Sequence, residues 1–188
     1  MNLLSNKIAL VTGGGRGIGR GHCLHLAKSG ASVLVNDIDL AEAKKVAEEI
    51  KGFGGKARTS AQDISSRSGA ERLIEECVNY FGTIDILVNN AGILKDKTFL
   101  KMNDEDFDSV WNIHVKGTFW CSQAASLVMK QKGEGGSIVN TTSGAHFGNF
   151  GQTNYSAAKG AIASMTYTWA IELSKYGIRV NAIGPLGT

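Results

Sequence analysis

Short apolar runs alternate with longer helical stretches along this chain, and that alternation limits the folds it can adopt. Residues 8–11 and 86–88 are apolar without the polar alternation of a half-exposed strand, which indicates strands buried on both faces. We expect strands at 8–12, 32–36, 56–60, 84–89, 137–142 and 178–183. The expected helices cover 17–29, 40–51, 66–81, 104–132 and 155–176. This order predicts an α/β fold, a doubly wound parallel sheet in a three-layer sandwich.

The composition fits one globular domain over residues 1–188. Hydrophobic residues make up 43% and charged residues 20% of the chain, which is enough for a substantial core. The formal net charge of +3 is spread along the sequence, so nothing indicates a nucleic-acid or anionic membrane partner. The chain stops a few residues after its last expected strand, just past Pro185, which predicts that a C-terminal strand is missing.

The cysteines and the N-terminus bear on the cellular compartment. Cys23, Cys77 and Cys121 are far apart and odd in number, so they predict neither a disulfide framework nor a metal site. The first residues lack the architecture of a signal peptide, and no apolar run is long enough to cross a bilayer. We therefore expect a cytoplasmic protein that uses no metal.

A glycine-rich turn follows the first expected strand and leads into the first helix. Its glycines, Gly13, Gly17 and Gly19, allow a sharp turn and a close approach of the backbone to a pyrophosphate at the helix N-terminus. Arg16 and Ile18 lie in the same turn. The spacing differs from G-x-G-x-x-G, and 24 of the 188 residues are glycine, so an ordinary strand-to-helix turn is the alternative.

An acidic residue ends the second expected strand. In dinucleotide folds a carboxylate at this place accepts hydrogen bonds from the adenosine ribose, and its charge repels a 2′-phosphate. Asp37 therefore favours NAD over NADP. Two alternatives remain open: Arg16 could attract a 2′-phosphate, or Asp37 could only cap the helix that starts near Leu40.

Two further strand ends carry residues suited to the same ligand. Asp63 follows the third strand and could accept from an adenine amino group, while Ile64 packs against the ring. Asn90 and Gly92 follow the fourth strand, where small residues permit close approach to a ribose. Either pair alone could be turn chemistry. Their recurrence at successive strand ends indicates a shared crevice.

Tyr155 and Lys159 are four residues apart in an expected helix, so their side chains lie on one face, one turn apart. A fixed positive charge beside a phenol favours the phenolate and brings proton exchange with a substrate oxygen within reach near neutral pH. In isolation this spacing is more often a surface tyrosine and a solvated lysine. The hydroxyl cluster at 141–143 and the glycine turn favour a catalytic interpretation.

Together these segments resemble the short-chain dehydrogenase/reductase family, whose fold is Rossmann-like. The matching segments are residues 12–19 as T-G-x-x-x-G-x-G, 89–92 as N-N-A-G, Ser143, Tyr155-x-x-x-Lys159, and 178–183 leading to Pro185. Residues 148–152, before Asn154, are similar to the (3R)-hydroxyacyl-CoA dehydrogenase part of type 2 multifunctional enzymes and to related acyl-thioester reductases.

The resemblance implies an NAD(P)-dependent oxidoreductase acting on CH–OH groups. In the family, Tyr155 is the general acid/base, Lys159 binds the nicotinamide ribose and lowers the tyrosine pKa, and Ser143 holds the substrate oxygen. NAD is the expected cofactor and NADP the less favoured one. The expected substrate is a secondary alcohol or ketone, with a 3-hydroxyacyl or 3-oxoacyl thioester as the narrower hypothesis. A catalytically silent dinucleotide-binding protein is the alternative.

The resemblance also implies a homodimer or homotetramer, and a substrate lid in the segment after Pro185, which this chain would lack.

Two positions depart from the family pattern. His114 occupies the place of an asparagine that helps a proton relay reach the lysine, so it either joins the relay or is a packed helix residue. The serine usually lies thirteen residues before the tyrosine, which would select Thr142. Strand alternation lets only one of Thr142 and Ser143 face the crevice, and the register favours Ser143.

Overall fold

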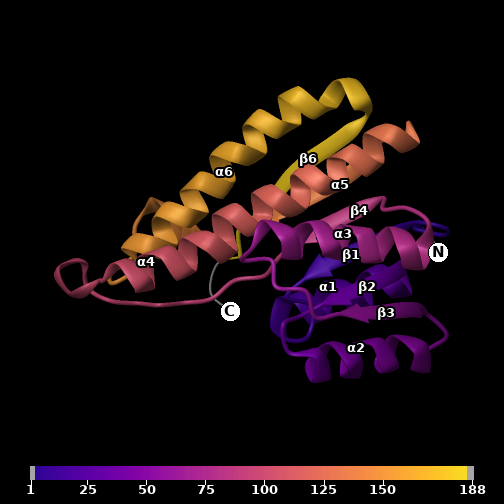
Figure 1. The fold of residues 1–188 in the computed structure, drawn as a ribbon, viewed down its shortest axis with the longest axis horizontal. Helices are drawn as coiled ribbons and strands as arrows, with labels where there is room; N and C mark the ends of the chain where they lie inside the picture. Colours follow the sequence, from indigo (N-terminus) through magenta and orange to yellow (C-terminus); the bar gives the residue numbers. More distant parts are fainter. Residues whose placement is uncertain (1–2, 186–188) are drawn as a thin grey trace.

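The computed structural model describes residues 3–185, and its centre is a six-stranded parallel sheet (Figure 1). The strands are β1 (Ile8–Thr12), β2 (Ser32–Asn36), β3 (Lys56–Ser60), β4 (Ile86–Asn89), β5 (Gly136–Thr141) and β6 (Ile178–Ile183). Their order across the sheet is β3-β2-β1-β4-β5-β6. Because successive strands are added on one side of β1 and then on the other, the predicted doubly wound arrangement is confirmed.

The strands lie within two residues of their predicted positions. β4 begins at Ile86 rather than at 84, and β5 is shifted by one residue and ends at Thr141. All five residues of β1 are buried, and β1 pairs with β2 on one side and β4 on the other. A central strand with helices on both faces has no solvent-exposed side, which explains its continuous apolar run.

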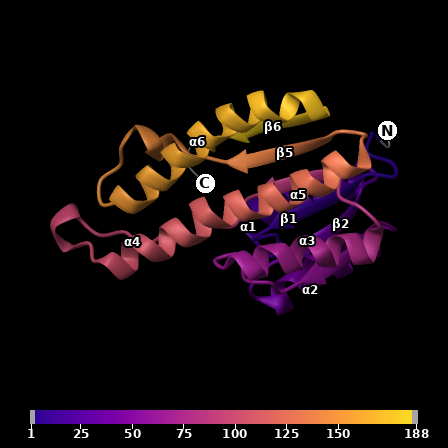
Figure 2. The same cartoon turned by 45° about the horizontal axis from the view of Figure 1, so that its top comes forward.

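Helices cover the two faces of the sheet as separate groups (Figure 2). On one face lie α1 (Gly17–Lys28) and α2 (Leu40–Gly52), where Cys23 and Val46 pack with Val33 and Val35. On the other face lie α3 (Arg67–Phe81), α5 (Thr118–Lys132) and α6 (Thr153–Leu173). They pack over the strand side chains that point to that face, such as Leu10. The two core layers follow from the alternation of side chains along each strand.

At the β6 edge, helices cover only one face of the sheet. Ile178 and Val180 are buried in the core with α5, whereas Arg179 and Asn181 are exposed. Within residues 3–185 the fold therefore has three layers over β1 to β3 and two layers at β6. The predicted additional C-terminal strand lies outside the described residues and stays a prediction.

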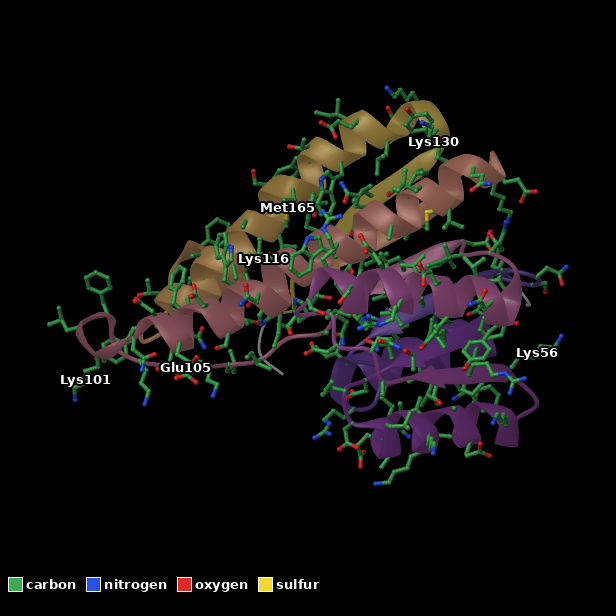
Figure 3. The ribbon with its side chains drawn as sticks, in the orientation of Figure 1. Lys56, Lys101, Glu105, Lys116, Lys130 and Met165 are labelled. Carbon is green, nitrogen blue, oxygen red and sulfur yellow. The ribbon has the colours of Figure 1, made fainter. Side chains whose placement is uncertain are left out.

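The helix expected over 104–132 is interrupted. It consists of α4 (Asp104–Trp111), a π-helical turn η2 (Asn112–Gly117) and α5. Figure 3 labels Lys116, from this turn, on the stretch between α4 and α5. Gly117 lies against Ile64, because a Cβ at Gly117 would be 3.0 Å from the Ile64 Cδ1 atom. Such turns are often found at functional sites, and this one carries His114.

Helix N-termini in this fold differ in how they are capped. Side chains of Asp39, Ser66 and Asn103 accept hydrogen bonds from the first turns of α2, α3 and α4. By contrast, α1 begins after Arg16 with no side-chain cap and no acidic residue in its first turn. The N-terminus of α1 therefore presents backbone N–H groups with no intrahelical partner where β1 ends.

Candidate active site

A crevice of about 770 Å³ lies at the carboxyl ends of β1 to β4. Ligands of doubly wound sheets bind at this edge, next to the point where the strand order reverses. The residues that line it include every strand-end residue that the sequence assigns to a dinucleotide: Gly13, Arg16, Gly17, Ile18, Gly19, Asp37, Asp63, Ile64, Asn90 and Gly92. The structure brings these residues together, and their binding roles remain a prediction.

The glycine turn is fastened to the loop after β4. The Thr12 hydroxyl accepts from the backbone N–H groups of Asn90 and Ala91 at 3.0 and 3.1 Å. The Asn90 amide donates to the backbone oxygens of Thr12 and Gly13 at 3.1 and 3.0 Å. Asn90 thus acts on the turn itself, a role that the sequence did not indicate. The two loops form one rigid floor for the crevice.

The floor of the crevice suits a pyrophosphate. The first residues of the uncapped helix α1 line it, and the helix dipole favours an anion at this end. Gly13 and Gly17 have φ of 62° and 52°, values that L side chains rarely adopt. A Cβ at Gly17 would meet no atom within 4 Å, so this glycine borders open space. A dinucleotide therefore fits the donors and the space that the turn provides.

Asp37 is buried and held by the backbone. Its Oδ2 atom accepts from the Gly15 N–H at 3.0 Å, and its Oδ1 atom accepts from the Asp39 N–H at 3.0 Å. The alternative that Asp37 caps α2 is wrong, because the Oδ1 atom of Asp39 accepts from the Ala41 and Glu42 N–H groups. Both Asp37 oxygens keep lone pairs for a ligand at the crevice.

After β3, Asp63 and Ile64 both form a turn and line the crevice. The Asp63 Oδ1 atom accepts from the Ser65 N–H at 2.8 Å, an Asx turn that leads into α3. Ile64 is 6% exposed and packs in the core while it lines the crevice. The structure thus contains both features that the sequence left as alternatives at this place.

A second cavity of about 550 Å³ adjoins the first, and Ile18 lines both. Ser143 and Tyr155 line this second cavity, together with Thr142 and Gln152. Because β5 ends at Thr141, Thr142 and Ser143 lie just beyond the strand, and both residues line this cavity. The choice of Ser143 over Thr142 stays a prediction.

The two hydroxyls at this place have different partners. The Thr142 hydroxyl donates to the backbone oxygen of Lys159 at 3.2 Å. The Ser143 oxygen accepts from the Ala145 N–H at 3.2 Å, so its own hydrogen is free to donate. Only Ser143 can therefore donate to a substrate oxygen without breaking a protein hydrogen bond.

Lys159 and Tyr155 lie together at the start of α6. The Lys159 Nζ atom is 5.3 Å from the centre of the Tyr155 ring, and it donates to the Thr141 backbone oxygen at 2.6 Å. Lys159 is 3% exposed, and burial lowers its pKa to about 8. The amine is therefore still charged at neutral pH and is fixed beside the phenol.

His114 packs under the same pair. Its ring meets the Tyr155 ring edge to face at 5.3 Å, and a Cβ on Gly92 would be 2.2 Å from its Cε1 atom. Its Nε2 atom is 3.0 Å from the Ile93 N–H and 2.9 Å from the Ile93 oxygen, so it bonds one or the other according to its tautomer. Burial, and then the charge of Lys159, lower the His114 pKa to about 4. The ring is neutral at physiological pH, and its Nδ1 atom is buried without a protein partner.

Two amides on either side of the α6 start, Gln152 and Asn154, were not predicted as site residues. The Gln152 Nε2 atom donates to Asp96 Oδ2 at 2.9 Å. The Asn154 amide donates to the backbone oxygens of Lys95 and Asp106, both at 3.0 Å. These bonds tie the loop after β4 to the helix that carries Tyr155. The sequence feature that could have pointed to these two residues is their position directly before Tyr155.

Residues 3–185 contain no group of three His, Cys, Asp or Glu side chains placed to hold a metal ion. None of the helices in this range combines the length and apolarity needed to span a membrane.

Comparison with known proteins identifies the family. The model of the short chain dehydrogenase family matches residues 7–188. The chain belongs to the short-chain dehydrogenase family. A short-chain dehydrogenase from Mycobacterium avium has a similar structure, with a TM-score of 0.94 and 39% identity over 98% of this chain and 69% of that one. The resemblance drawn from the sequence motifs is thereby confirmed.

Two relatives differ in how much of their own length this chain matches. It is 47% identical to the peroxisomal hydratase-dehydrogenase-epimerase of Neurospora crassa over 95% of this chain, but it spans only 20% of that enzyme. It is 40% identical to the 3-oxoacyl-[acyl-carrier-protein] reductase of Thermotoga maritima over 97% of this chain and 74% of the reductase. The similarity to the multifunctional enzymes is confirmed as well.

The buried charge of this short-chain dehydrogenase predicts a pH dependence of stability. A lysine pKa lowered from 10.5 to about 8 in the folded state corresponds to about 3 kcal/mol of free energy of unfolding. Between these pH values the unfolded chain binds the proton more tightly, so the wild type gains stability as the pH rises. Lys159→Met removes this gain.

Urea unfolding at several pH values tests this prediction. The stability of Lys159→Met relative to wild type should be highest below pH 8 and should fall by about 3 kcal/mol by about pH 10.5. Lys44→Met, which removes an exposed lysine from α2, is the matched control and should show no such fall. A stability difference for Lys159→Met that does not change with pH would contradict the burial of a charged amine.

Proposed function

We propose that this chain is an NAD(H)-dependent oxidoreductase that interconverts a secondary alcohol and a ketone. One observation carries the proposal: the Lys159 ammonium lies 5.3 Å from the centre of the Tyr155 ring, and Tyr155 and Ser143 line the same cavity. That cavity adjoins the crevice lined by the dinucleotide residues. A proton donor and a cofactor site therefore face the same space.

The roles follow from what each side chain can donate. In the reducing direction, the Tyr155 hydroxyl donates its proton to the substrate oxygen, and Ser143 donates a hydrogen bond to the same oxygen. Lys159 stabilises the phenolate that remains, because its charge is fixed beside the ring and bound to Thr141. A bound nicotinamide supplies the hydride. In the oxidising direction the phenolate takes the proton back.

His114 is proposed as a positioning residue in the proton path to Lys159. It is neutral, it contacts the Tyr155 ring, and its Nδ1 atom is buried without a protein partner, which suits a bound water. We expect His114→Leu to lower kcat and enlarge its solvent deuterium isotope effect, and His114→Asn to restore both in part. Equal isotope effects in wild type, His114→Leu and His114→Asn would show that His114 only packs against its neighbours and has no part in the proton path.

Cofactor preference is assigned to NAD because of Asp37. Its carboxylate is oriented by the Gly15 and Asp39 N–H groups and borders the crevice, where it can accept from two ribose hydroxyls. The same charge opposes a 2′-phosphate. NADP is the less favoured alternative, because the only support for it is Arg16.

The substrate class proposed is a 3-hydroxyacyl or 3-oxoacyl thioester. Two relatives carry thioester substrates in their names, the Thermotoga reductase and, at 37% identity, (2S)-[(R)-hydroxy(phenyl)methyl]succinyl-CoA dehydrogenase subunit BbsD of Thauera aromatica. The second cavity is open and is bordered by the side chains of Leu94, Asn149 and Gln152, which offer apolar and amide contacts to an extended substrate.

A substrate panel tests the proposal. Absorbance of the reduced cofactor is followed with 3-oxoacyl thioesters, sugars and steroid ketones, each with NADH and NADPH. We expect turnover with NADH and a 3-oxoacyl thioester. Turnover only with a sugar or steroid would overturn the substrate class, and cofactor binding without turnover on any ketone would indicate the silent dinucleotide-binding protein instead.

A homodimer or homotetramer is proposed from the outer face of α5 and α6. A groove of about 300 Å³ separates these helices, lined by Phe119, Leu127 and Trp169, with Lys130, labelled in Figure 3, at its end. Leu127 and Ile171 are 63% and 77% exposed, an apolar surface that a second copy would cover. We expect light scattering to give a dimeric or tetrameric mass for the wild type and a smaller mass for Ile171→Glu. A monomeric mass for both proteins would contradict the proposed oligomer.

The cytoplasm is the proposed compartment. Cys23, Cys77 and Cys121 are all buried free thiols, and burial raises the pKa of each to about 12. Reduced cysteines suit a reducing compartment. Several relatives are peroxisomal by name, so localisation of a tagged chain to peroxisomes rather than cytosol is the result that would overturn this assignment.

A further inference from the structure

Asp39 is a second carboxylate close to the end of the crevice that Asp37 lines, and it forms an ion pair with Arg16. The Arg16 Nη2 atom contacts the Asp39 Oδ2 atom at 3.1 Å. Arg16 lines the crevice, as does Asp37. The guanidinium that could attract a 2′-phosphate is therefore already paired with an acid two residues beyond Asp37.

Asp39 is fixed in place by three backbone groups. Its N–H donates to the Asp37 Oδ1 atom at 3.0 Å, and its own Oδ1 atom caps α2 by accepting from Ala41 and Glu42 at 3.1 and 3.3 Å. One oxygen is thus used by the helix, and the other holds Arg16. The chain of contacts runs from Asp37 through Asp39 to the guanidinium.

A second cation near this end is also paired with an acid. The Lys45 Nζ atom is 2.6 Å from Glu42 Oε1, so the charges of Arg16 and Lys45 are each balanced by a carboxylate. Asp37, which lines the crevice together with Arg16, adds a further negative charge that disfavours a phosphate dianion.

We infer that Asp39 is a second cofactor-selecting residue, which acts by holding the Arg16 guanidinium away from a 2′-phosphate. The inference rests on the proposed dinucleotide function and assigns part of its NAD preference to a residue outside the crevice. An exposed ion pair is weak, whereas an arginine–phosphate pair is a strong charge-assisted contact. Releasing Arg16 from Asp39 therefore lets it bind the extra phosphate of NADPH.

Fluorescence titration of NADH and NADPH with the full chain tests this inference. Asp39→Asn removes the charge but keeps a side-chain oxygen that can cap α2. We expect it to tighten NADPH binding about three- to fivefold, the range that loss of an exposed ion pair allows, and to leave NADH binding within about twofold of wild type. Arg16→Gln and the double variant Asp39→Asn/Arg16→Gln complete a double-mutant cycle.

The cycle separates an effect through Arg16 from a general charge effect. In the Arg16→Gln background, Asp39→Asn should no longer tighten NADPH binding. Glu49→Gln is the matched control, because it breaks a similar exposed pair between α1 and α2, with Arg20 at 2.6 Å, and should change neither affinity.

The outcomes distinguish this inference from the proposed function. NADPH binding by the Asp39→Asn variant that matches wild type, while both proteins still bind NADH, overturns the inference alone. An NADPH gain that persists in the Arg16→Gln background also overturns it, since the effect would then not pass through Arg16. A wild-type chain that binds neither NADH nor NADPH overturns the proposed function together with the inference.

Discussion

Replacing Tyr155 by phenylalanine is expected to lower kcat by about a thousandfold while cofactor affinity stays near that of the wild type. Positioned general acid–base catalysis contributes roughly 10² to 10⁴ to rates, and the variant loses only the hydroxyl that carries the proton. The ring itself stays packed against His114. Steady-state kinetics with a 3-oxoacyl thioester, together with a separate cofactor titration, measure the two effects.

Tyr167→Phe is the matched control for this experiment. Tyr167 lies on the same helix, α6, but it is 72% exposed and borders neither cavity. Its loss of a hydroxyl should leave kcat unchanged. Comparable turnover by Tyr155→Phe and wild type would refute the proton-transfer role and, with it, the chemical basis of the proposed function.

Gly19→Ala is expected to abolish measurable cofactor binding and to destabilise the fold by about 3 kcal/mol or more. A Cβ at Gly19 would be 2.0 Å from the Gly13 backbone oxygen and 2.4 Å from the Asn90 Nδ2 atom. Backbone cannot move aside as a flexible side chain can. The added methyl therefore separates α1 from the turn and breaks the fastening between the two loops.

Gly21→Ala provides the comparison two residues further along α1. A Cβ there would meet no atom within 4 Å, so the substitution should stabilise the protein by about 0.5 to 1 kcal/mol through helix propensity. Urea unfolding and NADH titration of both variants measure the contrast. Similar behaviour of the two alanine variants would show that the close approach at Gly19 is not what shapes the crevice.

The sheet was predictable because burial on both faces leaves a simple signal. The five buried residues of β1 and the apolar runs in β2 and β4 mark the central strands without reference to any partner. Strand ends were predictable to within two residues for the same reason. The crevice residues followed, because parallel strands place their carboxyl ends at one edge.

Features that depend on packing between distant segments were not predictable. The π-helical turn in 112–117 accommodates contacts of Gly117 with Ile64 and of His114 with Gly92, which no local pattern encodes. The hydrogen bonds that distinguish Thr142 from Ser143 were also not predictable, because one reaches α6 and the other lies in the loop after β5.

The two aspartates after β2 illustrate the same limit. From the sequence, Asp37 was the residue considered as a possible cap of α2, and Asp39 was not considered. The structure separates them, because Asp37 is drawn to the Gly15 N–H of a distant turn while Asp39 takes the cap. The ion pair of Asp39 with Arg16 follows from that division, and only the folded chain shows it.

Transfer of deuterium from NADH labelled at both C4 positions to a 3-oxoacyl thioester, followed by mass spectrometry and NMR of the product, addresses the main claim directly. The arrangement of Ser143, Tyr155 and Lys159 next to the glycine crevice predicts one deuterium on the carbinol carbon, in a single stereochemical configuration. A product without deuterium, or labelled equally in both configurations, would contradict it.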